Sequence, residues 1–116
     1  SDGDELGPVV NTFTTIDETP TAISWTVPSD SMTYFQVAAF GLDASYENCV
    51  YVFDGYAHKT GSTVTVGATS RYSYESDAAF NCTVAESSGD LKVTCTGLAT
   101  ASIKWKVVLS KYTVSL

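Results

Sequence analysis

Residues 79–97, AFNCTVAESSGDLKVTCTG, indicate a β-hairpin whose register can be assigned from the sequence alone. A turn at its Ser-Ser-Gly-Asp centre sets Cys82 opposite Cys95 and Val84 opposite Val93. These four side chains then share one face, and the threonines and the lysine between them take the other face. One apolar and one polar face are typical of an antiparallel strand pair that packs against a core.

The two cysteines of this hairpin are expected to be buried thiols that act as small apolar side chains. A cross-strand disulfide is the alternative, and it would have to tolerate a strained geometry. The chain has three cysteines and one histidine, with no C-x-x-C spacing, so no familiar zinc set can be completed. We therefore expect no metal site and no cofactor.

The rest of the chain has the composition of an all-β protein. It contains 116 residues, with 16 Thr and 13 Val against only 6 Leu. We expect a single antiparallel β-sandwich domain over residues 13–116, jelly-roll-like, with about 8–10 short strands. Strand-like runs fall at about 11–16, 21–27, 33–41, 48–56, 62–68, 70–75, 79–86, 91–97, 101–109 and 111–115.

The run 101–109 shows the alternation most clearly. Ile103, Trp105, Val107 and Leu109 are expected to point inward, because the lysines between them mark the solvent side. The alternation changes phase after Leu109, which predicts a bulge or a strand end near Ser110.

Residues 1–12 are predicted to form an extended N-terminal arm, because Gly and Pro interrupt a polar, acidic segment. Its acids Asp2, Asp4 and Glu5 lack the 12-residue loop and distal Glu of a calcium site. Charge is uneven along the chain, with a net −9 in residues 1–58 and +2 in residues 59–116. The total of −7 would repel nucleic acid, so no nucleic-acid partner is expected.

Two strand runs are apolar on both faces. In residues 49–56, Cys49, Tyr51 and Phe53 alternate with Val50, Val52 and Tyr56. In residues 34–40, Tyr34, Ala38 and Phe40 alternate with Phe35, Val37 and Ala39. A two-layer sandwich covers one face of each sheet, so the second apolar face requires a cover, and we expect another subunit to supply it. The candidate interface residues are Tyr34, Tyr51, Phe53, Tyr72 and Tyr74, together with Asp2, Asp4 and Glu5 of the arm.

Tyr72 and Tyr74 also lie on one face of a strand, where flat rings can stack on sugars, so glycan recognition is a second reading of the same residues. No catalytic motif is present: there is no G-x-S-x-G elbow and no phosphate-binding glycine loop, and His58 falls in a predicted hairpin turn. We therefore expect no enzymatic activity and no catalytic residue. The longest near-apolar run, residues 37–42, is far short of the roughly 18 residues of a membrane span, and no secretory leader is visible.

Over residues 14–109 the sequence resembles a β-rich domain of tailed-bacteriophage virion proteins. The motifs that carry the resemblance are TTIDETPT (14–21), YVFDGY (51–56), GST (61–63), VGAT (66–69), DAAF (77–80), GDLKV (89–93), TG (96–97) and IKWK (103–106). That family commonly has an aromatic residue at the position of Phe80 and aliphatic residues at Cys82 and Cys95. Lys111 and Tyr112 depart from its usual alternation.

The resemblance implies a non-enzymatic structural module of tail fibres, tail-associated proteins or head decoration proteins. It implies a virion component that is assembled in the bacterial host cytoplasm. A homotrimeric capsid decoration (cement) protein, bound to the major capsid protein, is the expected function. The alternative is a tail-fibre or receptor-binding tip module that recognises host surface glycan.

Overall fold

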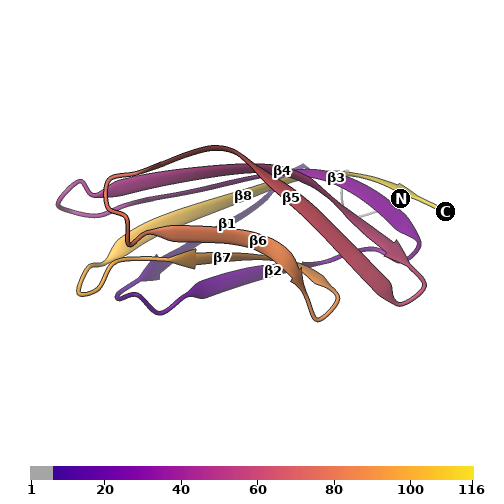
Figure 1. Cartoon of the computed structure of the whole chain (residues 1–116), viewed down its shortest axis with the longest axis horizontal. Helices are drawn as coiled ribbons and strands as arrows, with labels where there is room; N and C mark the ends of the chain where they lie inside the picture. The colour runs from indigo at the N-terminus through magenta and orange to yellow at the C-terminus, as the bar shows by residue number, and fades with distance from the viewer. Residues whose placement is uncertain (1–6) are drawn as a thin grey trace.

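The computed structural model describes residues 7–116, and within this range it holds eight antiparallel strands (Figure 1). No helix in that range is long and apolar enough to cross a membrane. The strands are β1 (Val9–Thr15), β2 (Thr21–Thr26), β3 (Ser31–Leu42), β4 (Asn48–Thr60), β5 (Thr63–Glu75), β6 (Asn81–Ser87), β7 (Asp90–Thr96) and β8 (Ile103–Ser115).

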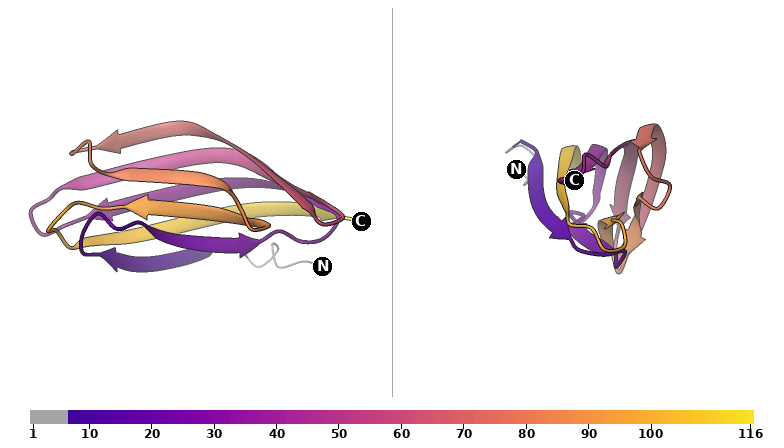
Figure 2. Two further views of the ribbon diagram at one scale, coloured as in Figure 1. Left: turned by 60° about the horizontal axis from the view of Figure 1, so that its bottom comes forward. Right: turned by 90° about the vertical axis from the view of Figure 1, so that its left-hand side faces the viewer.

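The strands form two sheets that pack face to face, as Figure 2 shows. The larger sheet has the order β1-β8-β3-β4-β5, and the smaller has the order β2-β7-β6. The chain crosses from one sheet to the other between β1 and β2, β2 and β3, β5 and β6, and β7 and β8. Strands β3, β4 and β5 follow one another as hairpins in the larger sheet, and β6 and β7 form a hairpin in the smaller one. The predicted all-β antiparallel sandwich is confirmed.

The β6–β7 hairpin has the register predicted from sequence. Cys82 pairs with Cys95, and Val84 pairs with Val93. The turn residues Ser88 and Gly89 both have positive φ (51° and 85°), which is the backbone of a two-residue hairpin turn of type I′. Both cysteines are free and buried, with their Sγ atoms 3.9 Å apart, so the buried-thiol prediction is confirmed.

The third cysteine, Cys49, is also buried and free. Burial raises the pKa of its thiol to about 12, because the interior solvates a thiolate poorly. The hydrogen bond between the Cys82 and Cys95 thiols, together with burial, raises the pKa of Cys95 far above its ordinary value. The thiols of Cys49 and Cys95 therefore stay protonated at neutral pH.

The predicted break near Ser110 is wrong. Strand β8 continues to Ser115 in unbroken register with β3, so Lys111 takes the inward position next along from Leu109 and is only 4% exposed. Its Nζ lies 5.4 Å from the ring centroid of Trp25, where the cation is attracted to the aromatic face while the aliphatic stem packs inside. Because this inward position holds a lysine in place of an apolar residue, the sequence looks as if the alternation shifted by one residue, although the strand continues unchanged.

The strand boundaries differ from the prediction at three further places. Strand β4 continues to Thr60, so His58 pairs with Met32 and Thr65 inside the sheet and does not lie in a turn. Runs 62–68 and 70–75 form the single strand β5, and the irregularity lies in its pairing with β4, between Val52 and Phe53. Strand β1 begins at Val9, opposite Leu109 of β8, so residues 9–12 of the predicted arm belong to the sheet. Asp2, Asp4 and Glu5 lie outside the described residues.

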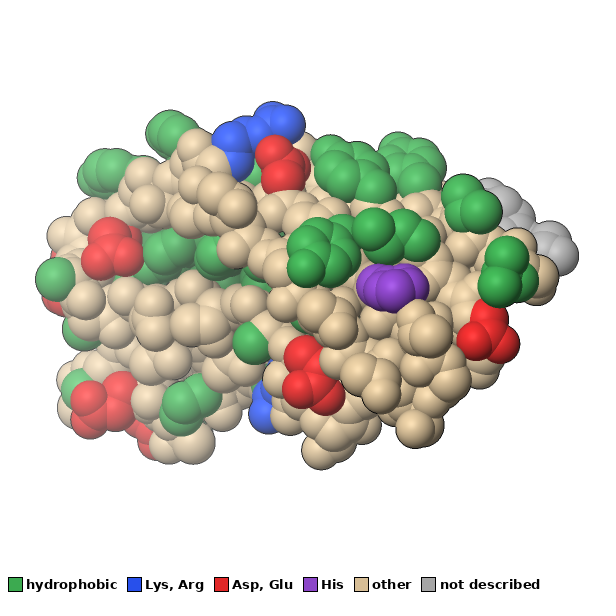
Figure 3. Space-filling view, turned by 45° about the vertical axis from the view of Figure 1, so that its right-hand side comes forward, with side chains coloured by type: hydrophobic (Ala, Val, Ile, Leu, Met, Phe, Trp, Pro, Cys, Tyr) green, Lys and Arg blue, Asp and Glu red, His purple; other side chains and the backbone are tan. Residues whose placement is uncertain are grey.

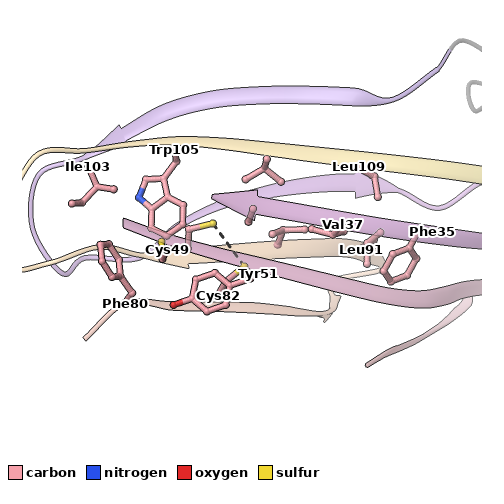
Figure 4. Packing of buried hydrophobic residues seen from close by; sticks show 14 of the residues in the cluster. Phe35, Val37, Cys49, Tyr51, Phe80, Cys82, Leu91, Ile103, Trp105 and Leu109 are labelled. Atoms are coloured by element: carbon pink, nitrogen blue, oxygen red, sulfur yellow. Dashed lines mark hydrogen bonds between the residues drawn. The ribbon is translucent and has the colours of Figure 1, made fainter. Parts of the chain in front are cut away.

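The core lies between the sheets and is built from alternate residues of each strand (Figure 4). Trp105 is its largest member, and the Trp105 ring meets Phe80 edge-on at 6.0 Å and stacks on Phe13 at 6.3 Å. The indole Nε1 donates a hydrogen bond to Thr15 Oγ1 at 3.0 Å. The inward residues include Phe35, Val37, Ala39, Cys49, Tyr51, Leu91, Val93, Ile103, Val107 and Leu109.

Candidate functional site: the outer face of the larger sheet

The face of the larger sheet that points away from the core carries large apolar side chains in the open. We call it the outer face. Each of the side chains named next is at least 40% exposed, so the smaller sheet leaves them uncovered. They are Met32, Tyr34, Phe40, Leu42, Tyr56, Tyr72, Tyr74, Tyr112 and Val114. Exposed apolar surface on this scale is typical of binding surfaces.

Three of the predicted interface residues lie on this face. Tyr34 is 49% exposed, and Tyr72 and Tyr74 are 58% and 51% exposed on the edge strand β5. The register sets Tyr72 beside Val52 and Tyr74 beside Val50, so the two tyrosines share a face as predicted.

The other two predicted residues lie on the opposite face. Tyr51 is only 5% exposed, and its hydroxyl donates a 2.6 Å hydrogen bond to Glu75 Oε1, while Phe53 packs against the core. Burial and this hydrogen bond raise the pKa of Tyr51 far above its ordinary value. Tyr51 therefore offers no surface to a partner. Both faces of β4 are apolar in sequence, and only pairing with β3 decides which one meets the core.

A polar group divides the outer face into two parts. Arg71 is the extra residue at the irregularity between β4 and β5, and its Nε donates to Asp54 Oδ2 at 2.7 Å. Gln36 Nε2 donates to the other oxygen of Asp54 at 3.4 Å. Figure 3 shows hydrophobic side chains on both sides of a contact between a basic and an acidic side chain.

The first part is a set of tyrosines that we call the tyrosine platform, made of Tyr34, Tyr56 and Tyr112. Tyr34 and Tyr112 stack with ring centroids 6.1 Å apart and planes 16° apart. Tyr56 lies against Gly67. If residue 67 had a Cβ atom, that atom would lie 2.4 Å from Cε1 of Tyr56. The glycine thus lets the Tyr56 ring approach the sheet closely, with 41% of the residue exposed.

His58 borders the tyrosine platform and lines a hollow of about 260 Å³ at the end of the sheet. Its Nε2 lies 2.9 Å from Thr60 Oγ1, and no contact with a carboxylate is recorded for it within residues 7–116. The same range contains no group of three or more His, Cys, Asp or Glu side chains placed to hold a metal ion.

The second part is a hollow of about 580 Å³ over strands β1, β8 and β3, which we call the lysine hollow. Phe40, Leu42, Lys104 and Lys106 line it together with the threonines of β1, and Trp105 lies at its base. Sequence reasoning placed the two lysines on the solvent side but did not find the hollow. Three strands that lie far apart in the chain build it, and no local pattern reports their order.

Comparisons with known proteins give a likeness of fold alone. No family model matches the sequence, and no curated protein is similar to it. Solved structures with a similar fold include two phage tailspike proteins. One is the tailspike protein of Acinetobacter phage vB_ApiP_P1, with a TM-score of 0.51 and 9% identity over 90% of this chain and 22% of that chain.

The other is tailspike protein gp49 of Acinetobacter baumannii bacteriophage Fri1, described as a capsular polysaccharide depolymerase. Its TM-score is 0.54, with 15% identity over 94% of this chain and 19% of that chain. This chain therefore has the fold of a domain found in phage tailspikes, and it spans about a fifth of the length of each.

This finding overturns the expectation of no enzymatic activity. A structural neighbour is a depolymerase, and the missing catalytic motifs do not bear on such an activity, because glycoside hydrolysis can rest on two carboxyl groups that no sequence motif marks.

Proposed function

We propose that this chain is a β-sandwich module of a bacteriophage tail-associated protein of the tailspike kind, and that its outer face contacts polysaccharide on the host surface. The observation that supports this most is the shared fold, which covers 90% and 94% of the chain against two tailspikes. The capsular polysaccharide in the description of one neighbour names the class of ligand to test.

The outer face has the chemistry that such a ligand requires. Sugar rings present apolar C–H faces that pack on exposed aromatic rings, and hydroxyl groups at their edges that need polar partners. Tyr72 and Tyr74 offer two rings on one edge strand, and the Arg71–Asp54 pair lies beside them with its side chains 58% and 31% exposed. The face therefore combines stacking surfaces with hydrogen-bonding groups that remain open to solvent.

The test is binding of the purified chain to capsular polysaccharides extracted from encapsulated bacteria, including Acinetobacter baumannii strains. Tyr72→Ala with Tyr74→Ala should lower the affinity at least about tenfold, since each ring contributes on the order of 1 kcal/mol. Tyr46→Ala is the matched control, because Tyr46 is 79% exposed but lies in the β3–β4 turn. Light scattering on each variant checks that the oligomeric state is unchanged.

Release of reducing ends from the same polysaccharides should be measured in parallel, because one neighbour is a depolymerase. Binding that is absent across the panel, or equal in the wild type and the double tyrosine variant, would overturn the proposal. The homotrimer and the capsid partner inferred from sequence stay predictions, and the mass from light scattering tests the first of them.

A further inference from the structure

The lysine hollow concentrates positive charge on a strongly acidic protein. The chain carries −7, yet no Asp or Glu lines this hollow. Lys104 and Lys106 are both exposed and lie two residues apart on β8, so they leave the same face of the sheet roughly 7 Å apart. Within residues 7–116 the ion pair of Arg71 goes to Asp54, and neither Lys104 nor Lys106 lies within ion-pair distance of a carboxylate.

Apolar and hydroxyl groups flank the two lysines in an ordered way. The register sets Lys104 between Leu42 of β3 and Thr14 of β1, and Lys106 between Phe40 and Thr12. Neighbours in such rows have Cβ atoms about 5 Å apart. Each ammonium group thus has an exposed apolar side chain on one side and a hydroxyl group on the other.

The hollow continues beyond these rows. A second hollow of about 360 Å³ shares Leu42 and Lys104 with the first and extends to Ala44 and Ser102. Asp43 also lines it, and the Oδ1 atom of Asp43 accepts the backbone N–H groups of residues 45 and 47 at 2.8 and 2.9 Å. The two hollows together form a trough that suits an extended chain of sugars better than one small molecule.

We infer that this trough binds an anionic polysaccharide, with its carboxylates held by Lys104 and Lys106 and a sugar ring packed on Phe40 and Leu42. The inference rests on the proposed function, from which it takes the polysaccharide, and it adds the charge class and the location. Lysine ammonium groups are compact, flexible point charges that pair with carboxylates in several geometries, as a polymer requires.

The test compares binding of alginate, a polymer of uronic acids, with binding of neutral dextran of similar length and of polyglutamate. Lys104→Gln with Lys106→Gln should weaken alginate binding roughly 5- to 30-fold, because each exposed ion pair contributes modestly. Lys59→Gln with Lys92→Gln is the matched control, since it removes the same charge elsewhere. Alginate binding by the wild type should also weaken as salt is raised from 50 to 500 mM.

Equal losses in the two lysine pairs would overturn the inference, since net charge alone would then explain binding. It would also fall if alginate did not bind, if dextran bound equally well, or if polyglutamate did so. The proposed function is judged separately, on the capsular panel and the Tyr72 and Tyr74 variants. Capsular binding that survives Lys104→Gln with Lys106→Gln but not the tyrosine changes would retain the function and remove the lysine trough.

Discussion

Substituting Gly97 by alanine places a methyl group where the structure has no room for it. A Cβ atom at this position would lie 2.3 Å from Thr15 Oγ1 and 3.2 Å from Ile103 Cγ1. Thr15 Oγ1 is the acceptor for the indole N–H of Trp105, and both residues are buried, at 3% and 2% exposure. The new methyl group therefore competes with the hydrogen bond that fixes the tryptophan beneath the lysine hollow.

The expected cost combines two effects and one offset. Forcing a methyl group into a packed core costs about 1–3 kcal/mol. Losing the acceptor for a buried indole N–H costs about 1–3 kcal/mol. Alanine also lowers the conformational entropy of the unfolded chain relative to glycine, which stabilises the fold by about 0.4–1 kcal/mol. We expect Gly97→Ala to lower the free energy of unfolding by about 2–4 kcal/mol, a large share of the roughly 5–15 kcal/mol of a typical domain.

Urea unfolding followed by tryptophan fluorescence and circular dichroism measures this cost in Gly97→Ala, Thr15→Ala and the double variant. Thr15→Ala removes the oxygen that the new methyl group meets first. Gly97→Ala should therefore cost at least about 1 kcal/mol less in that background. A cost for Gly97→Ala below about 0.5 kcal/mol, or the same cost in both backgrounds, would refute this account of the packing.

Other predictions concern the outer face and the core. Gly67→Ala should shift the near-ultraviolet circular dichroism of the tyrosines, because the Tyr56 ring must move off the sheet. The free energy of unfolding should stay within about 1 kcal/mol of the wild-type value. An unchanged spectrum would contradict the close approach of Tyr56 to Gly67. Tyr51→Phe should cost about 0.5–1.5 kcal/mol in urea unfolding, because Glu75 loses its donor, and a stabilised variant would argue against that bond. Burial raises the pKa of the Cys49 thiol from 9.0 to about 12. Because the folded protein holds the proton more tightly than the unfolded chain, the thiol stabilises the fold fully below pH 9. This stabilisation is lost between pH 9 and 12, by at most about 1.4 kcal/mol per pH unit. The difference in unfolding free energy between wild type and Cys49→Ala should therefore shrink over that range, and a constant difference would exclude the raised pKa.

Local features of the fold were predictable from sequence. The β6–β7 register follows from one turn signal and from alternation over a few residues, and the structure reproduces it. The inward positions of Ile103, Trp105, Val107 and Leu109 follow in the same way. Each of these predictions uses only residues that are neighbours in the chain or across one tight turn.

Features set by distant strands were not predictable. The two faces of β4 are equally apolar, so the burial of Tyr51 depends on the pairing of β4 with β3. Lys111 was interpreted as a change of phase because the ring of Trp25, which lies under its ammonium group, comes from the other sheet. The lysine hollow forms only when β8 lies between β1 and β3. Strand β8 is at the C-terminal end of the chain, and its two neighbours come from the first 42 residues.

The mixed chemistry of the outer face provides a way to separate its two readings. A second copy of the chain packed over the face would bury Arg71 and Asp54, and desolvating an ion pair often costs more than its attraction returns. A polysaccharide leaves the same pair hydrated or bound to hydroxyl groups. Arg71→Met should therefore strengthen self-association if the face is a subunit interface, since an apolar side chain replaces a charge at the contact. If the face binds sugars, as we propose, Arg71→Met should lower the affinity for polysaccharide, and its mass by light scattering should stay unchanged. A rise in mass with unchanged polysaccharide affinity would refute sugar binding by this face.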